Sequence, residues 1–295
     1  MDTNSNKLLI GSFVSSASPK YLLESIDIAM ACGENCFMIY TGSPQSFLRT
    51  DIQKMNVKEF KEKCKLNNIT LSNVIVHVPY IINLASNEKD KQEFAYNFLL
   101  NEIKRVSEIG CKYLVVHPGN ATNNITIDEA IENCARIINK LISNKENDVV
   151  ICLETMSGKG TEIGKSFQEI NQIISLIKSK NFIGVCLDTC HTWDAGYNWS
   201  DTNKIMNEFD KVIGLEYIKC IHLNDSLNEC GSKKDRHANI GYGKIGFDNL
   251  INICYHNDLI SLPKILETPV VTNEITTYKN EIEMIKDKKF INWMK

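Results

Sequence analysis

Eight short apolar runs, separated by stretches with helical spacing, constrain the fold of this 295-residue chain more than any other feature. Most of the runs, such as YLVVH and VVICLE, are nearly continuous in apolar residues, which is typical of parallel strands buried on both faces. One intervening stretch, 91–109, predicts a helix with Ala95, Leu99, Ile103 and Val106 on one face and Gly110 after its end. The predicted strands cover 8–14, 36–41, 74–80, 113–117, 149–155, 183–189, 217–223 and 264–268.

The alternation of strands and helices predicts βαβ units and a parallel sheet. Eight repeats favour a closed (β/α)8 barrel, the TIM barrel, over an open doubly wound sheet, although periodicity alone leaves closure open. No linker, low-complexity tract or block of charge divides the sequence. We therefore expect one α/β domain over 1–295.

Cysteine usage bears on the compartment. The chain has 11 cysteines, an odd number, several of them inside apolar runs and none in a CxxC pair. Buried free thiols are expected, and with them an intracellular, reducing compartment: the cytoplasm, or else a nucleus or a virion. The polar start MDTNSNK lacks the apolar core of a secretory signal, and no run is long enough to span a membrane, so no membrane partner is expected.

Histidine is scarce, yet five of the six histidines lie at or just after the C-terminal end of a predicted strand, and four carboxylates accompany them. Active sites of TIM barrels are built at the mouth that these strand ends face. His256 belongs to no motif and is expected to be structural. The other nine side chains should converge on one cavity: His77, His117, Glu154, Asp188, His191, His222, Asp235, His237 and Glu267.

Nine such side chains would be costly to bury without a partner, and a cluster of metal ions supplies one. Imidazoles and carboxylates suit zinc, and Asp188-Thr-Cys-His191 is a closely spaced pair of that kind. Nine ligands are too many for one tetrahedral ion; two ions are the minimum, and three fit if a carboxylate bridges. Ions about 3.5–4 Å apart are the usual apparatus for in-line attack on phosphodiesters.

The chain resembles the endonuclease IV family of abasic-site endonucleases over nearly its whole length. The long segments around DTCH and DRHANIG are highly specific, whereas LETP alone would mean little. The matching segments are VHVPYIINLAS (76–86), VVHPG (115–119), CLET (152–155), GVCLDTCHTWDAGY (184–197), HLNDS (222–226), GSKKDRHANIGYGKIG (231–246) and LETP (266–269).

The resemblance implies a monomeric enzyme that hydrolyses duplex DNA 5′ to an abasic site, leaving a 3′-OH and a 5′-deoxyribose phosphate, with trimming of 3′ ends as a further activity. It also implies three Zn²⁺ ions. The first would be held by His77, His117 and Glu154. Glu154, the expected catalytic residue, would bridge to the second ion, which Asp188, His222 and Glu267 complete. The third would be held by His191, Asp235 and His237.

The family flips the abasic sugar out of the duplex and fills the gap with side chains from loops at the barrel mouth. Tyr80 and Ile81 stand at the positions of inserting residues, and Gln45 stands where some members have arginine. Arg236, beside the DRH motif, is expected to contact a phosphate; the lysines of the KKDR segment either do the same or form a solvated loop. The net charge of −3 argues against broad nonspecific coating of nucleic acid, but three divalent ions would focus positive charge at the site.

Two alternatives use the same residues differently. A sugar isomerase or epimerase on this barrel would need one divalent ion, for which Glu154, Asp188, His222 and Glu267 would suffice. The other five predicted ligands would then have no function. A noncatalytic protein that binds DNA lesions would keep the cleft without the chemistry, and the complete set of predicted ligands argues against it.

Overall fold

The computed structural model describes residues 8–294, and eight parallel strands of this part of the chain form one sheet. The strands follow the order β1-β10-β7-β6-β5-β4-β3-β2 across the sheet. A parallel bridge between Phe13 and Met38 joins the two outermost strands, so the sheet closes and the predicted TIM barrel is confirmed. The strands are β1 (Ile10–Ser12), β2 (Phe37–Ile39), β3 (Val74–His77), β4 (Tyr113–Val116), β5 (Val150–Glu154), β6 (Ile183–Asp188), β7 (Ile218–His222) and β10 (Lys264–Leu266).

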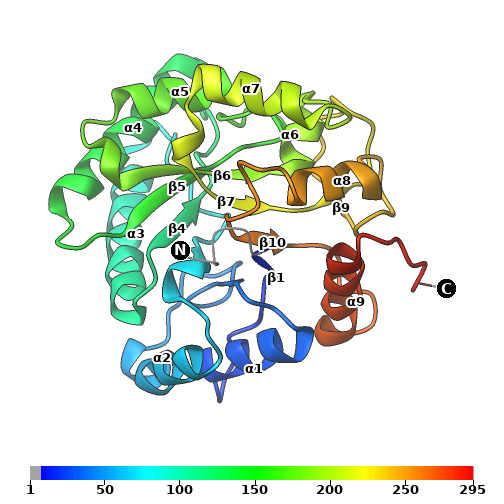
Figure 1. Ribbon diagram of the computed structural model, residues 1–295. Helices are drawn as coiled ribbons and strands as arrows, with labels where there is room; N and C mark the ends of the chain where they lie inside the picture. Colours follow the sequence, from blue (N-terminus) through cyan, green and yellow to red (C-terminus); the bar gives the residue numbers. More distant parts are fainter. Residues whose placement is uncertain (1–7, 295) are drawn as a thin grey trace, which may run out of the picture.

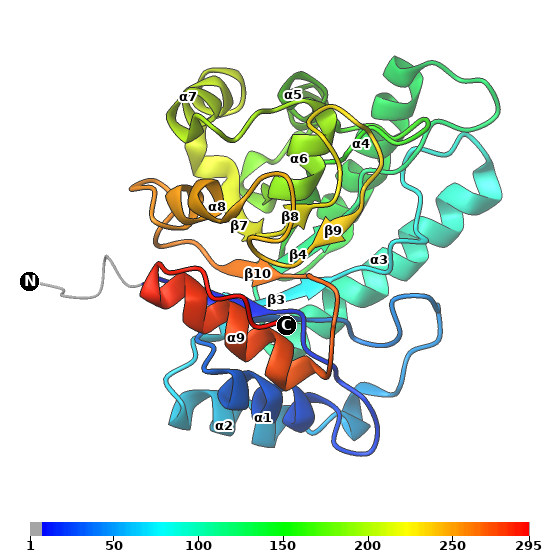
Figure 2. The same cartoon turned by 90° about the vertical axis from the view of Figure 1, so that its right-hand side faces the viewer.

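Helices follow the strands in turn and surround the barrel (Figure 1). α9 lies beside α1 although the two are at opposite ends of the chain (Figures 1 and 2). The helices of this ring are α1 (Leu22–Cys32), α2 (Val57–Leu66), α3 (Lys89–Ile109), α4 (Ile127–Asn144), α5 (Phe167–Leu176), α7 (Thr202–Val212), α8 (Phe247–Cys254) and α9 (Glu274–Asp287). Short 3-10 turns are η1 (Ile52–Lys54), η2 (Leu71–Asn73), η3 (Lys180–Phe182) and η4 (Leu215–Tyr217).

The helix predicted at 91–109 is α3, and its predicted apolar face is buried against the barrel. Gly110 ends it in the left-handed region, with a φ of 87°, where its N–H donates to the carbonyls of Val106 and Ser107. Glycine adopts this conformation without the steric cost that a side chain would add.

Each predicted strand contains an observed one, but several predicted runs are longer than the hydrogen-bonded strands. The run 74–80 is an example. Val78 N–H still donates to the carbonyl of Val115 at 2.9 Å, but Pro79 has no N–H to continue the ladder. Tyr80 therefore belongs to a turn at the barrel mouth rather than to a strand.

Two elements at the mouth were not predicted. α6 (Thr189–Ala195) directly follows β6, and an antiparallel hairpin of β8 (Asp225–Ser226) and β9 (His237–Ala238) follows β7. Figure 2 shows the hairpin beside β7 and near α6. Strands of two residues are too short to leave a period in the sequence, so pattern reading does not detect them.

The core has two layers. A large one fills the space between strands and helices, and a smaller one fills the inside of the barrel. Residues of the inner layer come from strands around the barrel and include four cysteines: Cys36, Met38, Tyr40, Ile75, Val115, Val150, Cys152, Cys186, Cys220 and Ile265. All 11 cysteines are free, and ten are buried, as predicted. No helix within residues 8–294 is both long and apolar enough to cross a membrane.

Candidate metal centre

The alternation of side chains along the strands places six of the predicted ligands at the barrel mouth. Successive side chains of a strand point to opposite faces, so the residue two positions after an inward-facing one also faces inward. Cys152 is followed in this way by Glu154, and Cys186 by Asp188. The same spacing relates four further pairs of inner-layer and site residues: Ile75 and His77, Val115 and His117, Cys220 and His222, and Ile265 and Glu267.

The two unpredicted elements bring in the remaining three predicted ligands. His191 lies on α6, where its backbone N–H donates to Asp188 Oδ1 at 2.6 Å and so caps the helix. His237 is the first residue of β9, and Asp235 lies two residues before it in the hairpin loop. The structure therefore brings all nine predicted residues to one place.

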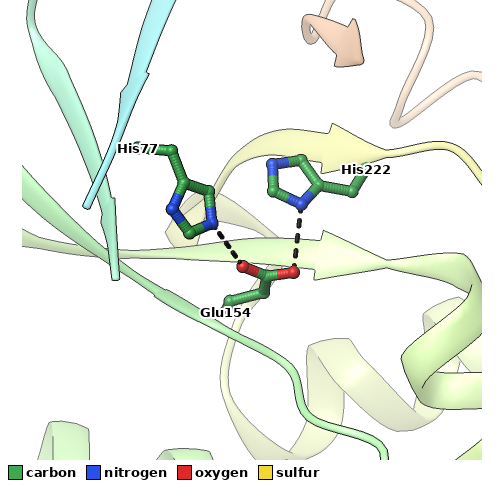
Figure 3. Close-up of side chains that lie close together, drawn as sticks. All are labelled: His77, Glu154 and His222. Carbon is green, nitrogen blue, oxygen red and sulfur yellow. Dashed lines mark hydrogen bonds and ion pairs between the residues drawn. The ribbon is translucent and has the colours of Figure 1, made fainter. Parts of the chain in front are cut away.

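Glu154 is the centre of this group. Its Oε2 lies 2.9 Å from His77 Nε2 and 3.1 Å from His117 Nε2. Its Oε1 lies 3.0 Å from His222 Nδ1 and 3.2 Å from His191 Nδ1. Figure 3 shows the carboxylate between the imidazoles of His77 and His222. One carboxylate thus faces four imidazoles from separate segments, as a bridging ligand would.

A second group of ligands adjoins Glu154. His222 Nδ1 lies 2.9 Å from Glu267 Oε2 and 3.9 Å from Asp188 Oδ2. Ligand atoms of Glu154, Asp188, His222 and Glu267 all lie within 4.8 Å of one another. Three carboxylates and one imidazole at this spacing can share a divalent cation.

A third group lies on the other side of Asp188. Ligand atoms of Asp188, His191 and His237 lie within 4.8 Å of one another. Asp235 Oδ1 joins them at 3.1 Å from His191 Nε2 and 3.7 Å from His237 Nε2. His237 Nε2 is buried, and no atom of residues 8–294 hydrogen-bonds to it. This nitrogen faces the carboxylates of Asp188 and Asp235 at distances too long for hydrogen bonds. A cation between them would fit this arrangement.

Backbone carbonyls fix the orientation of several imidazoles. Nδ1 of His77 lies 2.6 Å from the carbonyl of Val78, and Nδ1 of His237 lies 3.0 Å from that of Glu267. An Nδ1–H that donates to a carbonyl leaves the lone pair of Nε2 free for a metal ion. Both Nε2 atoms point into the groups described above, so the tautomer suits metal ligation.

The electrostatics favour the ionised form of two of the buried carboxylates, Glu154 and Glu267. Burial would raise the pKa of Glu154, but His222 and His117 outweigh it and hold this pKa well below its usual value. Burial would also raise the pKa of Glu267, but His222 lowers it to about 2. Burial raises the pKa of Asp188 despite the imidazoles near it.

The imidazoles show the reciprocal effect. Burial would lower the pKa of His222, but Glu267 and Glu154 raise it well above its usual value. Carboxylates likewise outweigh burial at His117 and His191 and raise the pKa of each. These opposite shifts favour ion pairs in which a proton lies between an imidazole nitrogen and a carboxylate oxygen. A divalent cation at the same place would displace these protons.

The residues predicted to contact DNA lie at the rim of the mouth, on three loops: one after β2, one after β3, and the loop between β8 and β9. Tyr80 and Ile81 are 49% and 38% exposed, and Gln45 and Arg236 are exposed as well. Arg236 Nη1 donates to the carbonyl of Asp235 at 2.9 Å, which holds the guanidinium beside the third group.

The sequence reading missed two apolar side chains in the loop after β2. Leu48 is 84% exposed, and Phe47 packs edge to face on Phe94 with ring centroids 4.6 Å apart. Arg49 holds this loop, since its Nε donates to the buried Glu102 at 2.8 Å. An apolar pair in an otherwise polar segment, SPQSFLRT, was the available signal.

Comparison with known proteins agrees with the TIM-barrel fold and with the family resemblance of the sequence. A family profile described as xylose isomerase-like TIM barrel matches residues 26–288. The probable endonuclease 4 of Mycoplasmoides gallisepticum is 45% identical over 97% of each chain. The crystal structure of endonuclease IV from Thermus thermophilus superposes with a TM-score of 0.81 at 26% identity, covering 95% of this chain and 99% of that one.

A D-tagatose 3-epimerase-like protein also superposes, with a TM-score of 0.69, over 94% of this chain and 99% of that one. At 19% identity it shows a shared fold alone. The near full-length relatives are named as endonucleases, which decides against the sugar isomerase alternative. The chain belongs to the endonuclease IV family of abasic-site endonucleases, hydrolases built on a TIM barrel.

Proposed function

We propose that this enzyme uses zinc to hydrolyse the DNA phosphodiester 5′ to an abasic site, leaving a 3′-OH and a 5′-deoxyribose phosphate. The observation that carries the proposal is the convergence of five imidazoles and four carboxylates at the barrel mouth. A sugar isomerase needs fewer than half of these residues.

Nitrogen and oxygen ligands in three adjoining groups support zinc and a count of three ions. His77, His117 and Glu154 would hold the first ion, and Glu154 would bridge to the second. Asp188, His222 and Glu267 would complete the second. The third would take His191, Asp235 and His237. Asp188, a ligand of the second ion, also lies 3.9 Å from a ring nitrogen of each of these two histidines.

When bound to such a cluster of ligands, zinc would supply an activated water and positive charge to offset the charge that develops on the phosphoryl oxygens. The protein supplies the geometry. Glu154 keeps the ligands of two ions together, and the carbonyls of Val78 and Glu267 hold the imidazoles of His77 and His237 in the ligating tautomer. The pKa values of Glu154 and Glu267 are lowered, so these two carboxylates stay ionised at neutral pH, ready for the cations.

Recognition of the lesion would come from the rim. An abasic nucleotide is the cheapest to flip out of a duplex, because no base pair has to be broken there. Tyr80 and Ile81 stand exposed three and four residues after His77, at a distance along the chain that suits insertion into the emptied stack. Arg236, held beside the third group, would bind a backbone phosphate. Gln45 would contact the duplex from the loop after β2.

The same centre would also remove blocking groups from 3′ ends, because that reaction hydrolyses a phosphodiester at the same position relative to the sugar. We propose that the enzyme acts as a monomer, since every one of the nine predicted ligands comes from one chain.

Metal analysis beside an incision assay tests the proposal. We expect about three zinc ions per chain and cleavage of a duplex that carries one abasic site, with no cleavage of the intact duplex. The 5′-labelled product should end in a 3′-OH that a DNA polymerase extends. An active, folded preparation that holds a single magnesium or manganese ion would contradict the three-zinc assignment.

A further inference from the structure

A tenth polar side chain, Asp194, is fully buried near the centre without belonging to the ligand groups. It lies on α6, three residues after His191. Its Oδ2 accepts the backbone N–H of Asp235 at 2.7 Å and that of Lys234 at 3.3 Å. Its Oδ1 accepts the hydroxyl of Ser226 at 2.8 Å. The Asp194 carboxylate therefore binds the main chain of Asp235, whose own side chain is a predicted metal ligand.

The end of α6 binds more of the same loop. The carbonyl of Asp194 accepts the N–H of Lys233 at 2.9 Å, and the carbonyl of Trp193 accepts that of Gly231 at 3.0 Å. The indole N–H of Trp193 donates to the carbonyl of Asn228 at 2.9 Å. The loop between β8 and β9 thus rests on one short helix along most of its length.

The loop conformation needs this support. Lys233 and Asp235 have φ values of 56° and 57°, in the left-handed region that is unfavourable for residues with a side chain. Such conformations turn successive N–H groups to one side, where they form a concavity that binds an anion. Here the anion is the carboxylate of Asp194, so removing it would leave two strained residues without the contact that holds them.

The contacts of Asp194 with this loop also affect the third ligand group. Asp235 Oδ1 lies 3.1 Å from His191 Nε2, and α6 carries His191 and has Asp188 as its N-cap. One helix therefore presents two ligands directly and fixes a third through Asp194. We propose that Asp194 is a positioning residue, whose carboxylate holds the 233–235 loop so that Asp235 reaches the third metal ion. This inference rests on the metal centre of the proposed function.

The test compares Asp194→Ala and Asp194→Asn with the wild-type protein. The affinity of each zinc ion is measured by competition with a chelator of known affinity, and the zinc content by mass spectrometry after dialysis. Loss of a residue that orients a ligand weakens metal binding by about tenfold to a hundredfold. We expect Asp194→Ala to lower the affinity for one zinc ion by this factor and to leave the affinities for the other ions unchanged. Asp194→Asn, which keeps one oxygen for the N–H groups, should lie between Asp194→Ala and wild type.

Two comparisons separate positioning from general stability. Ile173→Ala opens a cavity on the buried face of α5, away from the loop; it should lower the melting temperature and leave all zinc affinities unchanged. Asp235→Ala should lower the affinity for the same zinc ion as Asp194→Ala does. The variant that combines both changes should bind this ion no more weakly than Asp235→Ala alone. In the metal-free protein, amide hydrogens of 233–235 should exchange faster in Asp194→Ala than in Ile173→Ala.

An Asp194→Ala protein that keeps every zinc affinity would overturn the proposal, even if its melting temperature fell. If Asp194→Ala does not fold, unchanged zinc affinities in Asp194→Asn would overturn it equally. A wild-type protein that binds the ions but leaves abasic duplex intact would contradict the proposed function instead, and the zinc measurements would still decide the role of Asp194.

Discussion

Replacing Glu154 with glutamine changes the side chain that faces four imidazoles at the metal centre. Glutamine keeps the shape of the side chain but removes the charge, and its NH2 group can only donate. One of the carboxylate oxygens, each of which now lies between 2.9 and 3.2 Å from two ring nitrogens, would become a nitrogen that repels a cation. The bridge that we propose between the first two ions would be lost.

The size of the effect follows from burial. Removing one partner from a buried charged pair costs about 3–5 kcal/mol. If that loss falls on the transition state, the incision rate drops by about a hundredfold to several thousandfold, since about 1.4 kcal/mol corresponds to a factor of ten. Binding of abasic duplex should be nearly unchanged, because Tyr80, Ile81 and Arg236 remain in place at the rim.

The assay is single-turnover incision of an end-labelled duplex with one abasic site, with binding followed separately by fluorescence anisotropy. Glu132→Gln, the same chemical change at an exposed position of α4, is the matched control and should behave as wild type. If Glu154→Gln kept more than about a tenth of the wild-type rate, the barrier would have risen by less than about 1.4 kcal/mol, and Glu154 would not be the bridge.

Three further predictions concern recognition, metal content and pH. Tyr80→Ala should weaken binding of abasic duplex by roughly tenfold to a hundredfold, because stacking of a base on an aromatic ring contributes about 1–3 kcal/mol, while hydrolysis of a small activated phosphodiester should not change; equal losses on both substrates would remove Tyr80 from the recognition site. Prolonged chelation should abolish incision and zinc should restore it, as measured on the same duplex; activity that survives removal of all zinc would contradict zinc dependence. Burial raises the pKa of Glu34 to about 8 from 4.5, so between these values the folded protein keeps a proton that the unfolded chain loses. The unfolding free energy should therefore fall as pH rises through this window, by up to about 1.4 kcal/mol per pH unit for this group, and Glu34→Gln should remove that part of the slope in denaturant titrations; equal slopes in both proteins would show that Glu34 is ionised when folded.

The sequence predicted the barrel and the ligand set for related reasons. A strand buried on both faces leaves a run of apolar residues, and a polar residue at its end stands out against that run, as His117 does after YLVV. The mouth of a TIM barrel then brings such residues together whatever the lengths of the loops. The placement of His77, Glu154 and His222 needed no knowledge of side-chain contacts.

What could not be predicted depends on contacts between distant segments. The pairing of β8 with β9 spans the whole KKDR loop, and the carboxylate of Asp194 meets that loop some forty residues further along the chain. The exposed position of Leu48 likewise depends on Arg49 reaching Glu102 on α3. Local periodicity carries no information about such contacts, because each is decided by how separate elements pack.

The inner layer of the barrel limits the routes by which bound metal ions could exchange with solvent. Cys152, Cys186 and Cys220 face inward two residues before Glu154, Asp188 and His222, and all three are fully buried. Water and ions have no route through close-packed apolar side chains, so exchange with solvent would occur through the mouth alone. A duplex bound over the mouth would close that route. Transfer of zinc to a chelator should therefore be slower from the DNA complex than from the free enzyme. The bound substrate would thus slow loss of the metal during the reaction.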